Sequence, residues 1–111
     1  MAQDLLVPVD EIRKAAAEVA KANGARLAIL FGSYARGTAT RHSDVDIIFV
    51  EQTSDRFLDR LARYTDPLID RLKTSVEVLV YTPDEFERMK QQSFVRRAVE
   101  EGVVVYECGE V

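Results

Sequence analysis

Four short apolar runs, separated by segments with a helical pattern, constrain the fold of this chain more than any other feature. They are "RLAILF" at residues 26–31, "DVDIIFVE" at 44–51, "SVEVLVY" at 75–81 and "VVVYE" at 103–107. Such runs, rich in Val, Ile and Phe, are typical of strands, and none is long enough to cross a membrane. We therefore expect an α+β fold, with a small mixed β-sheet of about four strands and helices packed mainly on one face.

Two helices have clear signals in the sequence. The first is predicted at residues 9–22, where Ile12, Ala16 and Val19 recur at helical spacing. The second follows the third strand, where "TPDE" has the pattern of a capping box, with a threonine N-cap, a proline in the first turn and a glutamate two residues after the proline. This helix is expected to extend through Lys90.

The remaining helix predictions depend on single capping residues. Ser54 is expected to cap a helix after the second strand, and Pro67 is expected to interrupt that helical segment. Asp66 would then cap a second short helix that leads to the third strand. Ser93 is expected to cap one more helix, which ends near Gly102.

The second strand begins with two aspartates. Side chains alternate along a strand, so Asp44 and Asp46 are expected to point to one face and Val45 and Ile47 to the other. Two like charges this close raise the pKa of at least one of them unless a cation lies nearby. Either the aspartates are exposed to water at the start of the strand, or they hold a hard cation such as Mg²⁺.

Two further features accompany this pair. Gly32 and Ser33 end the first strand, where a glycine allows the backbone to approach a ligand closely and a following helical turn offers N–H groups to a phosphate. Glu77 lies inside the third strand, as either an outward side chain of an edge strand or a third metal ligand. Three carboxylates on adjacent strands can hold two Mg²⁺ ions.

The composition excludes several classes of protein. A net charge of -4 argues against a dedicated nucleic-acid-binding protein, and a single cysteine excludes an internal disulfide. The N-terminal stretch "MAQDLLVPVDEI" lacks the basic and long apolar regions of a signal peptide. We expect a cytoplasmic protein without a membrane segment, folded as one domain over residues 1–111.

The two motifs together resemble a known family. Gly32-Ser33, ten further residues, and Asp44-Val45-Asp46 are similar to the GS-x10-DxD signature of the DNA-polymerase-β-like nucleotidyltransferases. The short chain resembles the minimal nucleotidyltransferase (MNT) branch of that superfamily. The resemblance implies a polymerase-β-like nucleotidyltransferase fold, ATP as the substrate and two Mg²⁺ ions.

The resemblance also implies roles for individual residues. In the family, the two aspartates bind both metals, and a third carboxylate on a neighbouring strand completes one metal site and helps to activate the attacking hydroxyl. In the family, a basic residue is common in the loop between the two motifs. The arginines of "FVRRAVEEG" lie outside this loop and are interpreted as an exposed helix face. The implied site comprises Asp44, Asp46 and Glu77 for catalysis and the metals, and Gly32, Ser33 and Arg36 for the nucleotide, whereas Arg41 and His42 are interpreted as solvated loop residues.

The acceptor is the open part of the prediction. MNT proteins are typically paired with a HEPN-domain protein, often as antitoxin and toxin, which implies transfer of AMP to a tyrosine of a HEPN toxin. Two alternatives stay open. One is a nucleotidyltransferase for a small molecule whose acceptor site is formed by a homo-oligomer, and the other is a non-catalytic antitoxin that acts by binding alone.

Overall fold

The strands form one mixed sheet in the order β3-β2-β1-β4. In the computed structural model, which describes residues 6–109, β1 (Leu27–Phe31) pairs antiparallel with both β2 (Val45–Val50) and β4 (Val103–Glu107). β3 (Val76–Tyr81) pairs with β2 in parallel. The first five residues, which belong to the stretch compared with signal peptides, lie outside the described residues.

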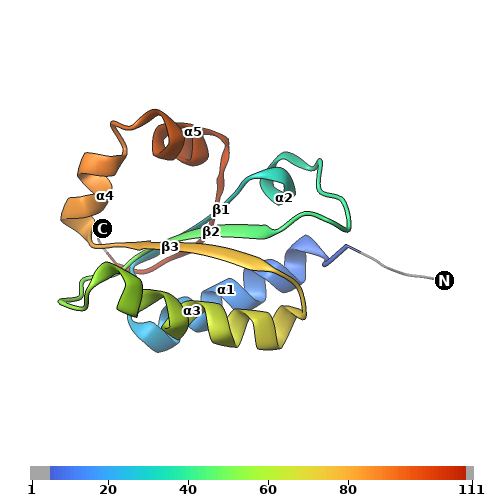
Figure 1. The fold of residues 1–111 in the computed structure, drawn as a ribbon, viewed down its shortest axis with the longest axis horizontal. Helices are drawn as coiled ribbons and strands as arrows, with labels where there is room; N and C mark the ends of the chain where they lie inside the picture. The colour runs from blue at the N-terminus through green and yellow to red at the C-terminus, as the bar shows by residue number, and fades with distance from the viewer. Residues whose placement is uncertain (1–5, 110–111) are drawn as a thin grey trace.

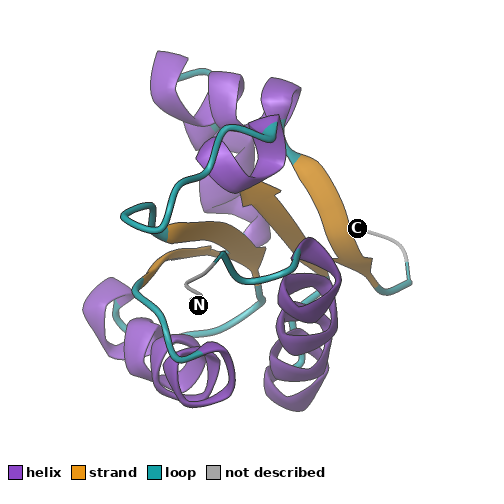
Figure 2. Cartoon of the chain, turned by 90° about the vertical axis from the view of Figure 1, so that its right-hand side faces the viewer, coloured by secondary structure: helices purple, strands orange, loops and turns teal. Residues whose placement is uncertain are grey.

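Helices cover both faces of this sheet (Figure 1). The two long helices, α1 (Val9–Asn23) and α3 (Phe57–Leu72), lie side by side on one face. The shorter α4 (Pro83–Met89) and α5 (Ser93–Glu101) cover part of the other face, and Figure 2 shows the strands between these two layers. α2 (Ser33–Arg36) is a single turn that follows β1.

The predicted α+β fold class is therefore confirmed, with four strands in a mixed sheet and the longer helices together on one face. No helix within residues 6–109 has the length and apolar character needed to span a membrane.

The alternation of side chains along β2 separates two apolar cores. On the face covered by α1 and α3, the ring of Phe49 packs against that of Tyr64, with the ring centroids 4.2 Å apart. Ile48 and Val50 point to the opposite face, where they belong to a second core beneath α4 and α5. Asp46 shares this second face because it is an even number of residues from Ile48.

The prediction of two helices separated at Pro67 is wrong, because α3 is continuous from Phe57 to Leu72. A proline inside a helix removes the N–H that would bond to the carbonyl four residues earlier, here that of Arg63. This carbonyl instead accepts a hydrogen bond of 3.2 Å from the side-chain amide of Asn23 on α1. The neighbouring helix thus replaces the lost bond, and Asp66 lies inside α3 rather than at a cap.

Two other capping predictions are also wrong. The N-cap of α3 is Arg56 rather than Ser54, and the N-cap of α5 is Gln92, with Ser93 as the first helical residue. Neither N-cap residue makes a side-chain capping bond. Both helices present strongly apolar faces to the sheet, so packing rather than capping decides where they begin.

A buried arginine ties α3 to the strands and to α4. Arg60 is 5% exposed and donates hydrogen bonds to the carbonyls of Asp55, at 2.9 Å, and Val80, at 3.0 Å. Its guanidinium also forms a forked pair with Glu85, at 2.6 and 3.2 Å, which lowers the pKa of that carboxyl. Glu85 in turn completes the predicted capping box of α4 with Thr82. One side chain therefore fixes three elements relative to one another.

We expect Arg60→Met to lower the free energy of unfolding by about 3 kcal/mol, because it leaves the buried carbonyl of Val80 and the carboxylate of Glu85 without their donor. Urea unfolding followed by circular dichroism measures the change. Arg96→Met on the exposed side of α5 is the matched control and should shift stability by less than about 0.5 kcal/mol. Equal stability of the two variants would contradict the role given to Arg60.

Candidate active site

Strand register brings the predicted carboxylates to one edge of the sheet. Asp46 lies opposite Phe31 in the antiparallel pair of β1 and β2 and beside Glu77 in the parallel pair of β2 and β3. Residues paired in this way point to the same face of a sheet. Asp44 directly precedes β2 and is two residues from Asp46. The structure thus places Asp46 and Glu77 side by side, with Asp44 next to them along the chain.

Gly32 makes room for the carboxylate of Asp46. It follows Phe31 at the end of β1 and has a φ of 76°, a conformation that favours glycine. A Cβ at this position would overlap the Oδ2 atom of Asp46 and lie 3.2 Å from its Cγ. Gly32 and Asp46, one from each motif, are therefore in direct contact, so the two motifs form one site.

The electrostatics of the site centre on Asp46. Burial, the charges of Glu77 and Asp44, and a hydrogen bond with Glu77 raise the pKa of Asp46 from 3.8 to about 6. The guanidinium of Arg36 acts in the opposite direction and lowers it. Asp46 therefore feels the charge of both neighbouring carboxylates, and a bound cation would relieve this repulsion.

The donor set fits Mg²⁺ in its chemistry. All three side chains offer carboxylate oxygens, which are the ligands that hard divalent cations prefer. Asp44 and Asp46 are half-buried and Glu77 is exposed, so each can turn toward a shared ion. In the described part of the chain, no three acidic, histidine or cysteine side chains already converge around one metal position.

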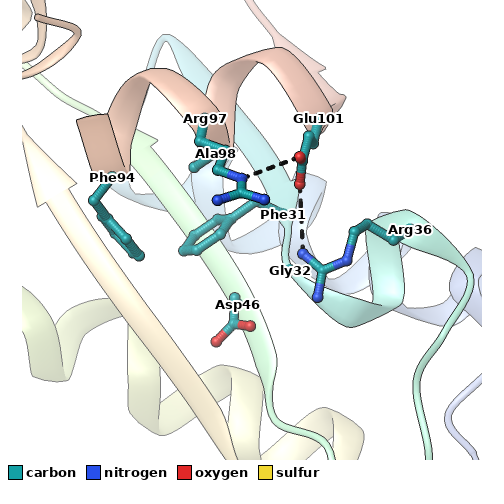
Figure 3. A pocket seen from close by; sticks show the side chains of 8 residues that line it. All are labelled: Phe31, Gly32, Arg36, Asp46, Phe94, Arg97, Ala98 and Glu101. Carbon is teal, nitrogen blue, oxygen red and sulfur yellow. Dashed lines mark hydrogen bonds and ion pairs between the residues drawn. The ribbon is translucent and has the colours of Figure 1, made fainter. Parts of the chain in front are cut away.

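A cavity of about 560 Å³ opens above this edge of the sheet (Figure 3). Its volume is within the range of pockets that bind small molecules. Asp46 and Gly32 form the side nearest the strands, and Arg36 projects into it from α2. The opposite wall is made by α5, through Phe94, Arg97, Ala98 and Glu101.

One ion pair joins α2 to α5 at the mouth of the cavity, and a second lies within α5. The carboxylate of Glu101 lies 3.5 Å from Arg36 and 3.3 Å from Arg97 (Figure 3). On the other side, the ring of Phe94 meets that of Phe31 edge to face, with centroids 5.9 Å apart. The cavity therefore has one side with charged groups and one with aromatic rings.

The structure brings most of the predicted site residues together. Gly32, Arg36 and Asp46 line one cavity, while Asp44 and Glu77 adjoin it through Asp46. Ser33 begins α2 beside this group without lining the cavity. Arg41 and His42 lie exposed in the loop before β2 and outside the cavity, in agreement with their interpretation as solvated residues.

Sequence reasoning missed the contribution of α5. The arginines of this helix were expected on an exposed face, and Arg97 is indeed accessible. The face formed by Phe94, Arg97 and Glu101 nevertheless looks across the cavity toward Asp46 (Figure 3). Their spacing of three and four residues places them on one side of a helix. This spacing could have indicated that the three residues share a helix face, but it does not indicate which part of the protein lies opposite that face.

Comparison with known proteins identifies the family. Residues 9–105 match the family model described as "Nucleotidyltransferase domain". The chain is also similar to a protein of Methanocaldococcus jannaschii named "Putative protein adenylyltransferase MJ0604". The two are 36% identical over 78 residues, which cover 70% of this chain and 75% of that protein.

Solved structures share the fold. A toxin-antitoxin crystallised with AMP-PNP superposes with a TM-score of 0.67 at 22% identity, over 89% of this chain and 74% of that one. A mutant form of the toxin-antitoxin MntA-HpeT gives a TM-score of 0.64 at 22% identity, over 93% and 75% of the two chains.

The family model spans every helix and strand that builds the site, and the relative agrees over more than two thirds of both chains. The chain therefore belongs to the nucleotidyltransferase family, which confirms the nucleotidyltransferase resemblance of its two motifs.

Proposed function

We propose that this protein is a Mg²⁺-dependent adenylyltransferase that transfers AMP from ATP to a tyrosine hydroxyl of a HEPN-domain toxin and so acts as its antitoxin. The observation that carries the proposal is the group of Asp44, Asp46 and Glu77 beside a cavity that also contains Arg36. The name of the archaeal relative supports adenylyl transfer to a protein. The toxin-antitoxin structures with the same fold support a toxin as the partner.

Each residue has a task in this reaction. When bound, Mg²⁺ neutralises charge on a triphosphate and favours the ionised form of an attacking hydroxyl. Asp44 and Asp46 would hold both ions, and Glu77 would complete the site of the ion nearer the acceptor. Arg36 would make a forked contact with a phosphate, and the backbone at Gly32 and Ser33 would approach the triphosphate closely.

The transfer itself is a substitution at the α-phosphorus. The acceptor oxygen forms a bond to this phosphorus, the bond to the bridging oxygen of the β-phosphate breaks, and pyrophosphate leaves. The hydroxyl proton passes to solvent or to Glu77, which is the most accessible of the three carboxylates. The protein contributes mainly by positioning the two reactants and stabilising charge.

A tyrosine of a protein partner suits this site as acceptor. Its hydroxyl has a pKa of about 10, so a neighbouring cation can ionise it near neutral pH. The net charge of -4 suits a protein acceptor better than RNA. An added AMP group is bulky and anionic, and it can block an RNA-binding cleft by size and repulsion. We place this reaction in the cytoplasm.

We predict that the protein labels a tyrosine of its genomic HEPN partner when incubated with Mg²⁺ and labelled ATP. Asp44→Asn and Asp46→Asn should each reduce labelling by about 100-fold or more, because each removes the charge of a metal ligand at little cost in volume. Asp66→Asn, an exposed aspartate of α3, is the control and should label at the wild-type rate. Mass spectrometry of the partner measures the modification.

Other outcomes separate the alternatives. A partner that is inhibited without modification would favour an antitoxin that acts by binding alone. A partner that is neither modified nor inhibited would turn attention to small-molecule acceptors. Wild-type labelling by Asp46→Asn would contradict the metal-binding role of the aspartates.

Glu77→Gln should slow the chemical step by about tenfold or more while changing ATP affinity by less than about threefold. The reason is that Glu77 is assigned to the ion nearer the acceptor rather than to the triphosphate. Single-turnover kinetics and equilibrium binding of ATP separate the two effects, with Glu107→Gln on β4 as the control. A variant with weakened ATP binding and unchanged turnover would show that the assignment is wrong.

The affinity for Mg²⁺ should decrease as the pH is lowered below about 6. The pKa of Asp46 is raised to about 6, and a protonated Asp46 cannot bind a cation. Folding raises the pKa of Asp46, so the folded protein without Mg²⁺ loses stability as the pH rises from the unfolded pKa of this carboxyl to its folded pKa. Above about pH 6 the ionised carboxylate therefore destabilises the fold. Asp46→Asn should therefore raise the Tm at pH 7.5 without Mg²⁺. Added Mg²⁺ should raise the Tm of the wild type only.

Thermal unfolding at pH 5.0 and 7.5, with and without Mg²⁺, measures both effects. At pH 5.0 the stabilisation of the wild type by Mg²⁺ should be largely lost. An equal response to Mg²⁺ at both values of pH, or in both proteins, would contradict the role of Asp46.

A further inference from the structure

Glu101 lies between two arginines at the mouth of the cavity. Its carboxylate pairs with Arg97 one helical turn earlier on α5 and with Arg36 on α2, at 3.3 and 3.5 Å (Figure 3). The three side chains are partly or largely accessible, with exposed fractions of 38% for Glu101, 49% for Arg36 and 78% for Arg97. The pair of Glu101 and Arg36 therefore connects α5 with α2, and its two side chains are not packed in place.

Apart from these two arginines, the surroundings of Glu101 do not favour a glutamate at this position. Glu101 is the last residue of α5, where the helix dipole favours a cation. Its pairing with Arg97 has the arginine N-terminal to the glutamate, which is the weaker orientation in a helix. On the opposite side of the cavity, burial and the charges of Glu77 and Asp44 already raise the pKa of Asp46. A fourth carboxylate there adds to the negative charge that an incoming nucleotide meets.

Resting on the function proposed above, we propose that α5 forms the second wall of the donor site, where Arg97 joins Arg36 in binding the phosphates of a nucleoside triphosphate. Glu101 occupies the position of a phosphate in the nucleotide-free protein and is exchanged for the donor. It keeps both guanidinium groups directed into the cavity until the nucleotide replaces it.

The geometry supports this exchange. A guanidinium offers a planar fork of donors that matches a carboxylate and a phosphate equally well, so one can replace the other on the same side chain. Arg36 is near enough to Asp46 to lower its pKa and also contacts Glu101, so it already lies between the strand edge and α5. Arg97 lines the same cavity from the opposite wall. A triphosphate anchored near Asp46 therefore has an arginine on either side.

Isothermal titration calorimetry with AMP-PNP and Mg²⁺, in the absence of an acceptor, tests the exchange. Arg97→Gln should weaken binding about tenfold, the loss expected for one charge-assisted contact. Glu101→Gln should tighten binding about threefold, because it removes a competitor and a negative charge. Arg96→Gln and Glu100→Gln, neighbours on α5 that do not line the cavity, are the matched controls and should bind as the wild type does.

A second ligand distinguishes phosphate binding from a general effect. AMP lacks the β- and γ-phosphates, so Arg97→Gln should weaken AMP binding much less than AMP-PNP binding. Circular dichroism of every variant verifies folding, and these residues are accessible enough for the fold to tolerate the changes.

The outcomes separate this inference from the function on which it rests. A wild-type protein that binds no AMP-PNP overturns the proposed function and the inference together. If the wild type binds AMP-PNP but Arg97→Gln binds like Arg96→Gln, only the role of Arg97 is overturned. If Glu101→Gln weakens binding instead of tightening it, Glu101 positions the arginines in the bound state and the exchange is wrong.

Discussion

The contact between Gly32 and Asp46 is the constraint on which the rest of the site depends. The register of β1 and β2 places Asp46 opposite the last residue of β1, and the absence of a side chain on Gly32 lets the carboxylate lie against the backbone there. The parallel register of β2 and β3 then places Glu77 beside it. A slip of one residue between β2 and β3 would turn Asp46 and Glu77 to opposite faces of the sheet, and a slip between β1 and β2 would move Asp46 away from Gly32.

This arrangement gathers negative charge that the metal-free protein tolerates poorly. Burial and the charges of Glu77 and Asp44 together raise the pKa of Asp46, and Arg36 compensates for only part of this effect. In the proposed reaction the same carboxylates bind Mg²⁺, and the bound cations attract the triphosphate. Stability is supplied elsewhere, by two apolar cores on the two faces of the sheet and by the buried Arg60 network. Functional sites typically lower the stability of a protein in return for binding, while the rest of the fold supplies the stability.

The sequence predicted the parts of the structure that depend on local pattern. Alternation along the second apolar run predicted that Asp46 and Val45 point to opposite faces, and the apolar runs predicted the four strands of the described sheet. It did not predict that α3 passes through Pro67, because the compensating bond comes from Asn23 on a different helix, far away in the chain. It also did not predict that Arg97 faces the cavity, because helical periodicity defines a face but not the neighbour opposite it.

The central claim is that the three carboxylates and Arg36 together hold a metal-bound nucleotide. A crystal structure with Mn²⁺ and AMP-PNP tests it most directly, since anomalous scattering locates the metal independently of the nucleotide. We expect metal peaks among Asp44, Asp46 and Glu77, bridged to the phosphates, with Arg36 on a phosphate oxygen. Metal bound elsewhere, or a nucleotide outside the cavity with Glu77 turned into solvent, would contradict the account.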